Sequence, residues 1–125
     1  MEDIRIKTMP YDYRGRTYTL ACNMNVLADV QADFNGDIGA ALNRKNGIRA
    51  TFSFLAAMMN DWADSQGWPE RVTAKELGRD LTDFATVGRL GGEIFALVAD
   101  AMKPAEETGE ETEKNGETTQ STQAE

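Results

Sequence analysis

The chain has 125 residues, of which 41% are hydrophobic and 27% are charged, and its 21 acidic and 13 basic side chains give a formal net charge of -8. This is the length of one domain, and we expect neither a secretory signal nor a transmembrane helix, because no long apolar run is present. There is no histidine, and Cys22 is the single cysteine. Histidine chemistry, intrachain disulfides and cysteine-based zinc sites are therefore excluded. We expect a reducing, cytoplasmic setting.

The negative charge is concentrated near the C-terminal end. Residues 104–125 contain seven Glu and one Lys, a net of -6, whereas residues 1–103 have 14 acidic and 12 basic side chains, a net of -2. Residues 104–125 also lack aromatic and branched aliphatic side chains, so they cannot bury enough surface to offset the entropy lost on ordering. The sequence predicts a single domain over 1–103 and a disordered acidic tail over 104–125. The overall acidity argues against nucleic acid and membranes as partners.

Residues 4–21 have the alternation of apolar and polar side chains that is typical of a β-hairpin. Arg14 and Gly15 have the chemistry of a two-residue turn between the strands. The facing pairs in this register are Tyr13/Arg16, Tyr11/Tyr18 and Met9/Leu20. Because proline has no N–H to donate, Pro10 should either lie on an edge strand or break the strand.

The residues after the hairpin have helical periodicity. We expect a helix over 24–34, with Asn23 or Asn25 as its N-cap, and a short helix over 37–42. A longer helix follows and ends near Gly67. Its predicted apolar stripe is Ile48, Phe52, Leu55, Met59 and Trp62.

The clearest helix start is a capping box at Thr73 and Glu76. The Thr73 hydroxyl can accept from the Glu76 amide while the Glu76 carboxylate accepts from the Thr73 amide, so a helix should begin at Ala74. Thr82 or Asp83 should cap the last helix. Its predicted buried stripe is Val87, Leu90, Ile94, Leu97 and Ala101. The fold class is therefore mainly α (α+β): an N-terminal β-hairpin followed by a compact bundle of four to five helices.

Three glycines, Gly88, Gly91 and Gly92, lie inside the last predicted helix. Each costs about 1 kcal/mol relative to Ala, so we expect the close approach of another backbone to compensate for them. They do not follow a strand and no P-loop lysine accompanies them, so a phosphate-binding loop is disfavoured.

No catalytic arrangement is evident in the sequence. Ser53 and Ser65 do not lie in a nucleophile-elbow motif, and Asp61 and Asp64 lie one turn apart opposite the apolar stripe, as on a solvated face. Cys22 is interpreted as a small buried hydrophobe. We therefore predict a protein without catalytic residues, cofactor or metal site.

Residues 72–92 are also compatible with a helix-turn-helix motif in which 83–90 form the recognition helix. Arg89 would be the main cation available for phosphate contacts, and Asp83 and Glu93 lie close to it in the sequence, whereas a DNA-reading surface normally has several cations. A small DNA-binding or regulatory helical protein is the alternative function.

Several short motifs occur in a characteristic order. They are Gly15, Tyr18 and Leu20 as G-x-x-Y-x-L, a helix with Leu27 before an amide-rich turn, the apolar residues 54–57, and the capped helix start at 72–78. Together they cover about residues 13–102, and the chain resembles the small tail assembly chaperones of siphophages, prophages and gene transfer agents. It departs from that pattern in its longer N-terminus and in its glycine cluster.

The resemblance implies a non-enzymatic protein of the host-cell cytoplasm that is absent from the mature particle. It would bind the tape-measure protein, keep its hydrophobic helices soluble and help to recruit tail-tube subunits. A structural component of the phage particle is a further alternative. Methionines near the apolar stripes offer adaptable contact surfaces, although each could simply belong to the core. The partner-binding residues that we predict are Phe54, Met58 and Trp62, with Leu90 and Phe95 across from them.

Overall fold

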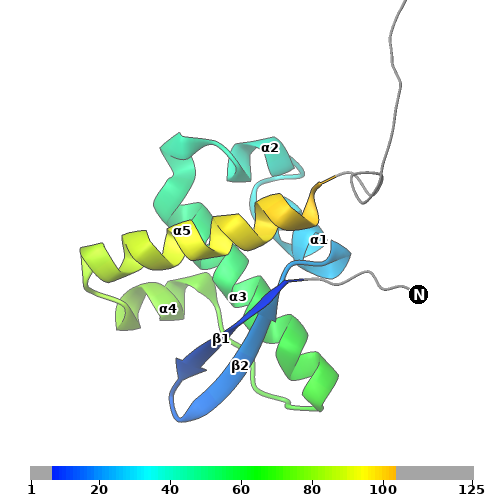
Figure 1. Cartoon of the computed structure of the whole chain (residues 1–125), viewed down its shortest axis with the longest axis vertical. Helices are drawn as coiled ribbons and strands as arrows, with labels where there is room; N and C mark the ends of the chain where they lie inside the picture. The colour runs from blue at the N-terminus through cyan, green and yellow to red at the C-terminus, as the bar shows by residue number, and fades with distance from the viewer. Residues whose placement is uncertain (1–6, 104–125) are drawn as a thin grey trace, which may run out of the picture.

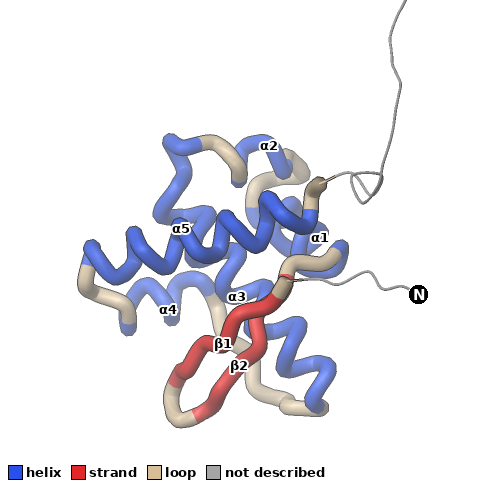
Figure 2. The backbone as a smooth tube through the Cα atoms, in the orientation of Figure 1, coloured by secondary structure: helices blue, strands red, loops and turns tan. Residues whose placement is uncertain are grey.

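A computed structural model of the chain describes residues 7–103 and contains a hairpin followed by helices (Figure 1, Figure 2). The elements are β1 (Thr8–Tyr13), β2 (Arg16–Ala21), α1 (Met24–Asp33), α2 (Ile38–Ala41), the 3-10 turn η1 (Arg44–Asn46), α3 (Gly47–Gln66), α4 (Ala74–Asp80) and α5 (Phe84–Ala101). The predicted fold class is confirmed for these residues. The part of the predicted first strand before residue 7 and the predicted acidic tail over 104–125 lie outside the described residues.

The hairpin has the predicted register, with Tyr13 opposite Arg16, Tyr11 opposite Tyr18 and Met9 opposite Leu20. Arg14 and Gly15 both have positive φ, 49° and 80°, which is the backbone of a type I′ turn and matches the twist of the strands. Pro10 is tolerated because both strands of a two-stranded sheet are edge strands. The face that contains Leu20 is turned toward the helices and is buried.

The cap residues act as the sequence predicted. Asn23 accepts from the Val26 amide, Asp83 accepts from the Ala85 amide, and the capping box of α4 is complete. These starts depend on a few adjacent residues, which explains why the pattern alone located them.

Helix α3 is buried on all sides in its middle section. Every residue from 50 to 59 is buried, so the predicted one-sided stripe was too narrow, and its first member, Ile48, is 56% exposed. The stripe missed this because the other faces of the helix carry buried small residues, such as Ala50, Ser53 and Ala57, and also the large side chains of Phe54 and Met58. α1, α4, α5 and β2 all contact α3, which lies in the middle of the fold (Figure 1).

Asp61 also differs from its predicted solvated state. It is half-buried and accepts a hydrogen bond of 2.7 Å from the Asn23 side chain, which is the N-cap of α1. Asp64 is exposed as predicted and forms an ion pair with Arg71. One of the two carboxylates therefore connects α3 to the start of α1.

The tip of the hairpin is attached to the C-terminal end of α4. The Tyr13 hydroxyl donates to an Asp80 carboxylate oxygen at 2.5 Å, and the same oxygen accepts from the Arg14 guanidinium at 2.8 Å. Burial, together with this bond to Asp80, raises the pKa of Tyr13 to about 12. The bond from Tyr13, together with the nearby charge of Arg14, lowers the pKa of Asp80.

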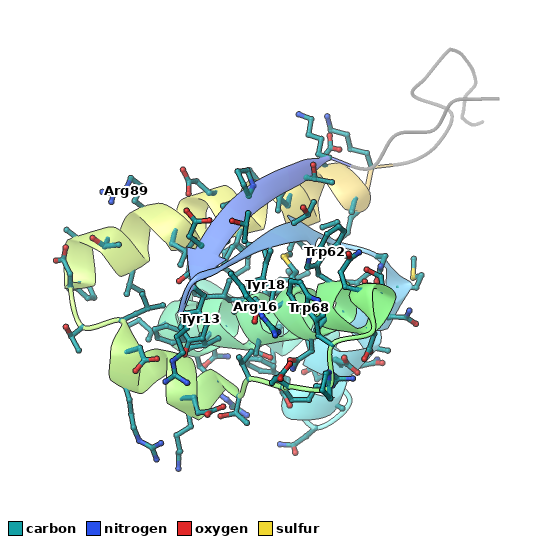
Figure 3. All side chains as sticks on the ribbon, turned by 90° about the horizontal axis from the view of Figure 1, so that it is seen from below. Tyr13, Arg16, Tyr18, Trp62, Trp68 and Arg89 are labelled. Carbon is teal, nitrogen blue, oxygen red and sulfur yellow. The ribbon has the colours of Figure 1, made fainter. Side chains whose placement is uncertain are left out.

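The body of the hairpin holds the loop between α3 and α4 (Figure 3). The Arg16 guanidinium lies 4.3 Å from the centre of the Trp68 ring and forms an ion pair with Glu70 at 3.0 Å. Tyr18 meets the same indole ring edge to face, with centroids 5.4 Å apart. The strands thus position a loop that follows them by about fifty residues in the sequence.

We expect Asn60→Ala to lower the free energy of unfolding by about 1–3 kcal/mol. The Asn60 side chain donates to the Val72 carbonyl and accepts from the Val72 amide, each at 2.9 Å, and fixes the loop just before α4. Urea unfolding measures the change. Asn25→Ala is the control, because Asn25 is exposed; an equal effect of the two substitutions would contradict the assigned role of Asn60.

The Tyr13–Asp80 bond should stabilise the fold only over a range of pH. Because the folded-state pKa of Tyr13 is raised from 10.0, its contribution is complete below pH 10 and is lost as the pH rises toward about 12. Because the pKa of Asp80 is lowered from 3.8, its contribution is present above that pH and is lost as the pH falls below it. The difference in unfolding free energy between wild type and Tyr13→Phe should therefore be largest near neutrality. A difference that does not change with pH would refute this assignment.

Candidate functional site

The predicted partner-binding residues belong mainly to the core. Phe54 and Met58 are completely buried, Leu90 is buried, and Trp62 and Phe95 are half-buried. The predicted approach of the two helices is confirmed, because the rings of Phe54 and Phe95 meet edge to face with centroids 5.5 Å apart. Phe54 and Met58 are covered by the fold itself, whereas Phe95 lines the groove described next, so a partner-binding role of these residues stays a prediction.

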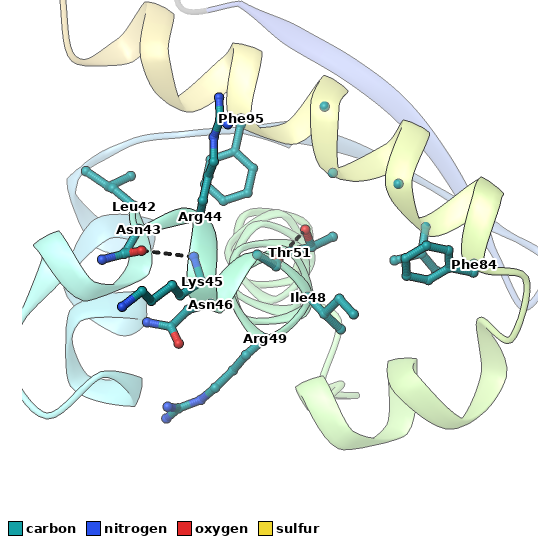
Figure 4. Close-up of a pocket in the computed structure, with 15 residues that line it drawn as sticks. Leu42, Asn43, Arg44, Lys45, Asn46, Ile48, Arg49, Thr51, Phe84 and Phe95 are labelled. Carbon is teal, nitrogen blue, oxygen red and sulfur yellow. Dashed lines mark hydrogen bonds between the residues drawn. The ribbon is translucent and has the colours of Figure 1, made fainter.

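Exposed apolar side chains collect at a different place. Among residues 7–103, five large hydrophobic side chains are exposed, and three of them, Leu42, Ile48 and Phe84, line one groove. The groove has a volume of about 790 Å³ and lies between the start of α3 and the first three turns of α5 (Figure 4). We call it the α5 groove. One wall is residues 42–49 with Thr51, and the other wall is Phe84, Val87, Gly88, Gly91, Gly92 and Phe95.

The three helical glycines all lie on the α5 wall, but they have different surroundings. A Cβ atom on Gly91 would lie 2.8 Å from the Thr51 hydroxyl oxygen, so the predicted close approach exists there, with a side chain and not a backbone. A Cβ atom on Gly88 or Gly92 would meet nothing within 4 Å. No close contact therefore offsets the low helix propensity of Gly88 and Gly92, and at these two positions the backbone of α5 is exposed to the groove.

The side chains of Thr51, Asn43 and Asn46, which line the groove, already form hydrogen bonds within the fold. The Thr51 hydroxyl donates to the Gly47 carbonyl at 2.8 Å, and Asn43 accepts from the Lys45 amide at 2.9 Å. The Asn46 side chain donates to the Ala40 carbonyl, also at 2.9 Å. The groove therefore offers apolar contact area and few of the polar groups that orient a small substrate.

The charges at the groove have a single sign. Its described lining contains Arg44, Lys45 and Arg49 and no carboxylate, in a chain with a net charge of -8. Arg49 points away from the groove, where it donates to the Asp33 carbonyl and lies 4.3 Å from the centre of the Phe34 ring (Figure 4). Arg44 and Lys45 are exposed.

A second groove lies between α1, α3 and α4 and has a volume of about 720 Å³. Its walls contain Asp29, Asp33 and Lys75, and its apolar floor is formed by Phe52, Ala56 and Ala57, all of which are buried. It offers a partner little apolar surface, so the α5 groove is the better candidate site.

The possible metal ligands and the thiol of the described residues are the next features of the structure. Within residues 7–103, no group of three or more Cys, Asp or Glu side chains is placed to hold a metal ion. Cys22 is buried, as predicted, and burial raises the pKa of its thiol, which keeps it protonated at neutral pH. No helix of the described chain has the length and apolar character needed to cross a membrane.

The geometry does not favour the helix-turn-helix alternative. The predicted recognition segment, 83–90, forms the start of α5, where Phe84 and Gly88 are exposed together with a single cation, Arg89. Asp83 caps this helix and places a carboxylate at its N-terminus. A surface of this kind would repel phosphate groups at the position where a recognition helix approaches DNA.

Comparison with protein-family models, with curated proteins and with solved structures gave no match to this chain.

Alanine substitutions at Gly88 and Gly91 should change the free energy of unfolding in opposite directions. Gly88→Ala should raise the free energy of unfolding by about 1 kcal/mol, because it improves helix propensity and the new methyl group meets no atom. Gly91→Ala should lower it by about 1 kcal/mol, because the buried Thr51 hydroxyl must turn away and lose its bond to Gly47, a loss of about 2 kcal/mol that outweighs the gain in helix propensity. Thermal unfolding of both variants provides the test. Stabilisation by Gly91→Ala equal to that by Gly88→Ala would contradict the close contact.

Proposed function

We propose that this protein is a non-enzymatic tail assembly chaperone that binds an apolar helix of the tape-measure protein in the α5 groove. The observation that supports the binding role is the gathering of Leu42, Ile48 and Phe84, all exposed, along one groove. The sequence motifs that resemble tail assembly chaperones support the choice of partner.

The shape of the groove suits a helix. Phe84 and Phe95 lie at its two ends on α5, so it follows that helix for about 16 Å, or three turns. The bare backbone at Gly88 and Gly92 lets a second helix approach α5 more closely than ordinary side chains would allow. A helix lying there would cover the exposed apolar groups and bury its own apolar stripe.

The proposed chaperone role depends on covering apolar surface of the tape-measure protein. The long hydrophobic helices of a tape-measure protein would aggregate in water, and a chaperone that occupies part of their apolar surface keeps them soluble. The protein would act in the host-cell cytoplasm, help to recruit tail-tube subunits, and leave before the particle is finished.

A tagged pull-down from particle-producing cells, followed by mass spectrometry, tests the proposal. Tape-measure or tail-tube protein should be bound to the tagged chain, and the chain should be absent from purified particles. Its recovery in mature particles would make it a structural component instead. Recovery of DNA alone would favour the DNA-binding alternative.

Charge substitutions in the groove should remove binding without unfolding the protein. We expect Ile48→Glu and Phe84→Glu each to weaken tape-measure binding by about ten-fold or more, since each places a carboxylate in an apolar contact. Both side chains are exposed, so the free energy of unfolding should change by less than about 0.5 kcal/mol.

Met24→Glu is the matched control for these variants. Met24 is 77% exposed and does not line the groove, so this substitution adds the same charge at an exposed apolar position elsewhere. Quantitative pull-down with each variant measures the difference. An equal loss of binding in Met24→Glu would place the contact outside the α5 groove.

A further inference from the structure

We infer that the helix bound in the α5 groove has a cluster of carboxylates at one end, which pairs with Arg44 and Lys45. This inference rests on the proposed function, because it adds the charge of the partner to a groove already proposed to bind a helix. Its basis is the distribution of charge and apolar surface around the groove.

The two cations have no carboxylate partner in the described part of the chain. Within residues 7–103, neither Arg44 nor Lys45 forms an ion pair, whereas Arg14, Arg16 and Arg71 each have a carboxylate within 3.0 Å. Lys75, Arg79 and Arg89 likewise have no ion pair among the described residues. What distinguishes Arg44 and Lys45 is their position, because both are exposed beside an apolar groove whose described lining has no acidic residue.

An exposed cation is normally satisfied by water, but a docked helix would change that. A purely apolar helix lying against Arg44 and Lys45 would remove part of their hydration and give no compensating charge. A helix with carboxylates at this position would restore the lost interaction and would also be steered toward the groove before contact. The apolar lining and the two cations therefore select the same class of partner.

The two ends of the groove differ in charge, and this difference sets the direction in which the partner helix binds. Arg44 and Phe95 lie at one end, and Phe84 lies at the other end, beyond Ile48 (Figure 4). The acidic end of the bound helix should lie near Phe95, and its apolar stripe should continue toward Phe84.

Two other occupants fit the groove less well. Residues 104–125 of this chain supply seven Glu but no large apolar side chain, so they could pair with the cations without covering Leu42, Ile48 or Phe84. A second copy that pairs groove to groove would bring Arg44 and Lys45 from both copies into a single interface. An acidic amphipathic helix satisfies both features.

Two designed peptides test this inference with the full chain. Each is an alanine-rich helix of about 20 residues with the same leucine stripe, and one has a cluster of glutamates where the other has lysines. Fluorescence anisotropy should show that the glutamate peptide binds at least about ten-fold more tightly, with an advantage that decreases at high salt.

Paired charge reversals make the assignment specific. In Arg44→Glu/Lys45→Glu the preference should reverse, so that the lysine peptide binds more tightly. The control variant Lys75→Glu/Arg79→Glu changes the net charge by the same amount at exposed positions on α4 and should keep the original order. Circular dichroism of each variant checks that the fold is intact.

Equal affinity of the two peptides for the wild-type chain would overturn the inference. If Ile48→Glu then abolished the binding of both peptides, the proposal that the α5 groove binds a helix would be supported. The inference that the groove selects an acidic helix would be contradicted. Binding of either peptide only after the glutamates of 104–125 are replaced by Gln would assign the groove to this chain's own acidic segment. Failure of both peptides, with a dimer in sedimentation that Phe84→Glu dissociates, would assign it to a second copy. Each of these results also overturns the inference.

Discussion

The burial of α3 on every side over residues 50–59 is the constraint on which the other elements depend. A helix surrounded in this way needs small residues where its neighbours approach, and Ala50, Ser53 and Ala57 supply them. Two of its buried polar side chains are paired, because Ser53 donates to Asp33 of α1 and Thr51 donates to Gly47, whereas the buried Trp62 Nε1 has no hydrogen-bond partner among the described residues. α1, α4, α5 and β2 each pack on a different part of this one helix, and they contact one another less.

The same arrangement explains where the candidate site lies. α5 crosses α3 and buries Phe54 and Leu90 at the crossing, so those side chains cannot meet a partner. The first turn of α3 extends beyond this cover, which leaves Ile48 exposed beside the start of α5. Gly88 and Gly92 add no side chains to fill the space between the two helices, and the space remains as a groove with an apolar lining.

The candidate site could be predicted only in part from the sequence. The predicted facing of α3 and α5 agrees with the ring contact of Phe54 and Phe95, and Phe95 lines the groove, but Phe54 and Met58 are buried in the fold. Periodicity identifies apolar side chains without showing which of them a neighbouring helix covers. Leu42, Ile48 and Phe84 belong to three separate segments, so no linear pattern connects them. The unexplained glycines inside α5 were the one signal in the sequence that pointed to this place.

The features that could be predicted from the sequence depend on a few adjacent residues. These are the hairpin register set by its two-residue turn, the capping box at Thr73, and the helix end at Gly67, where a φ of 75° suits glycine. The packing of the elements shows which apolar residues are covered, which glycines face an open space, and that Arg44 and Lys45 lie beside the α5 groove. Those properties depend on contacts between segments far apart in the chain, and local free energies contain no information about such contacts.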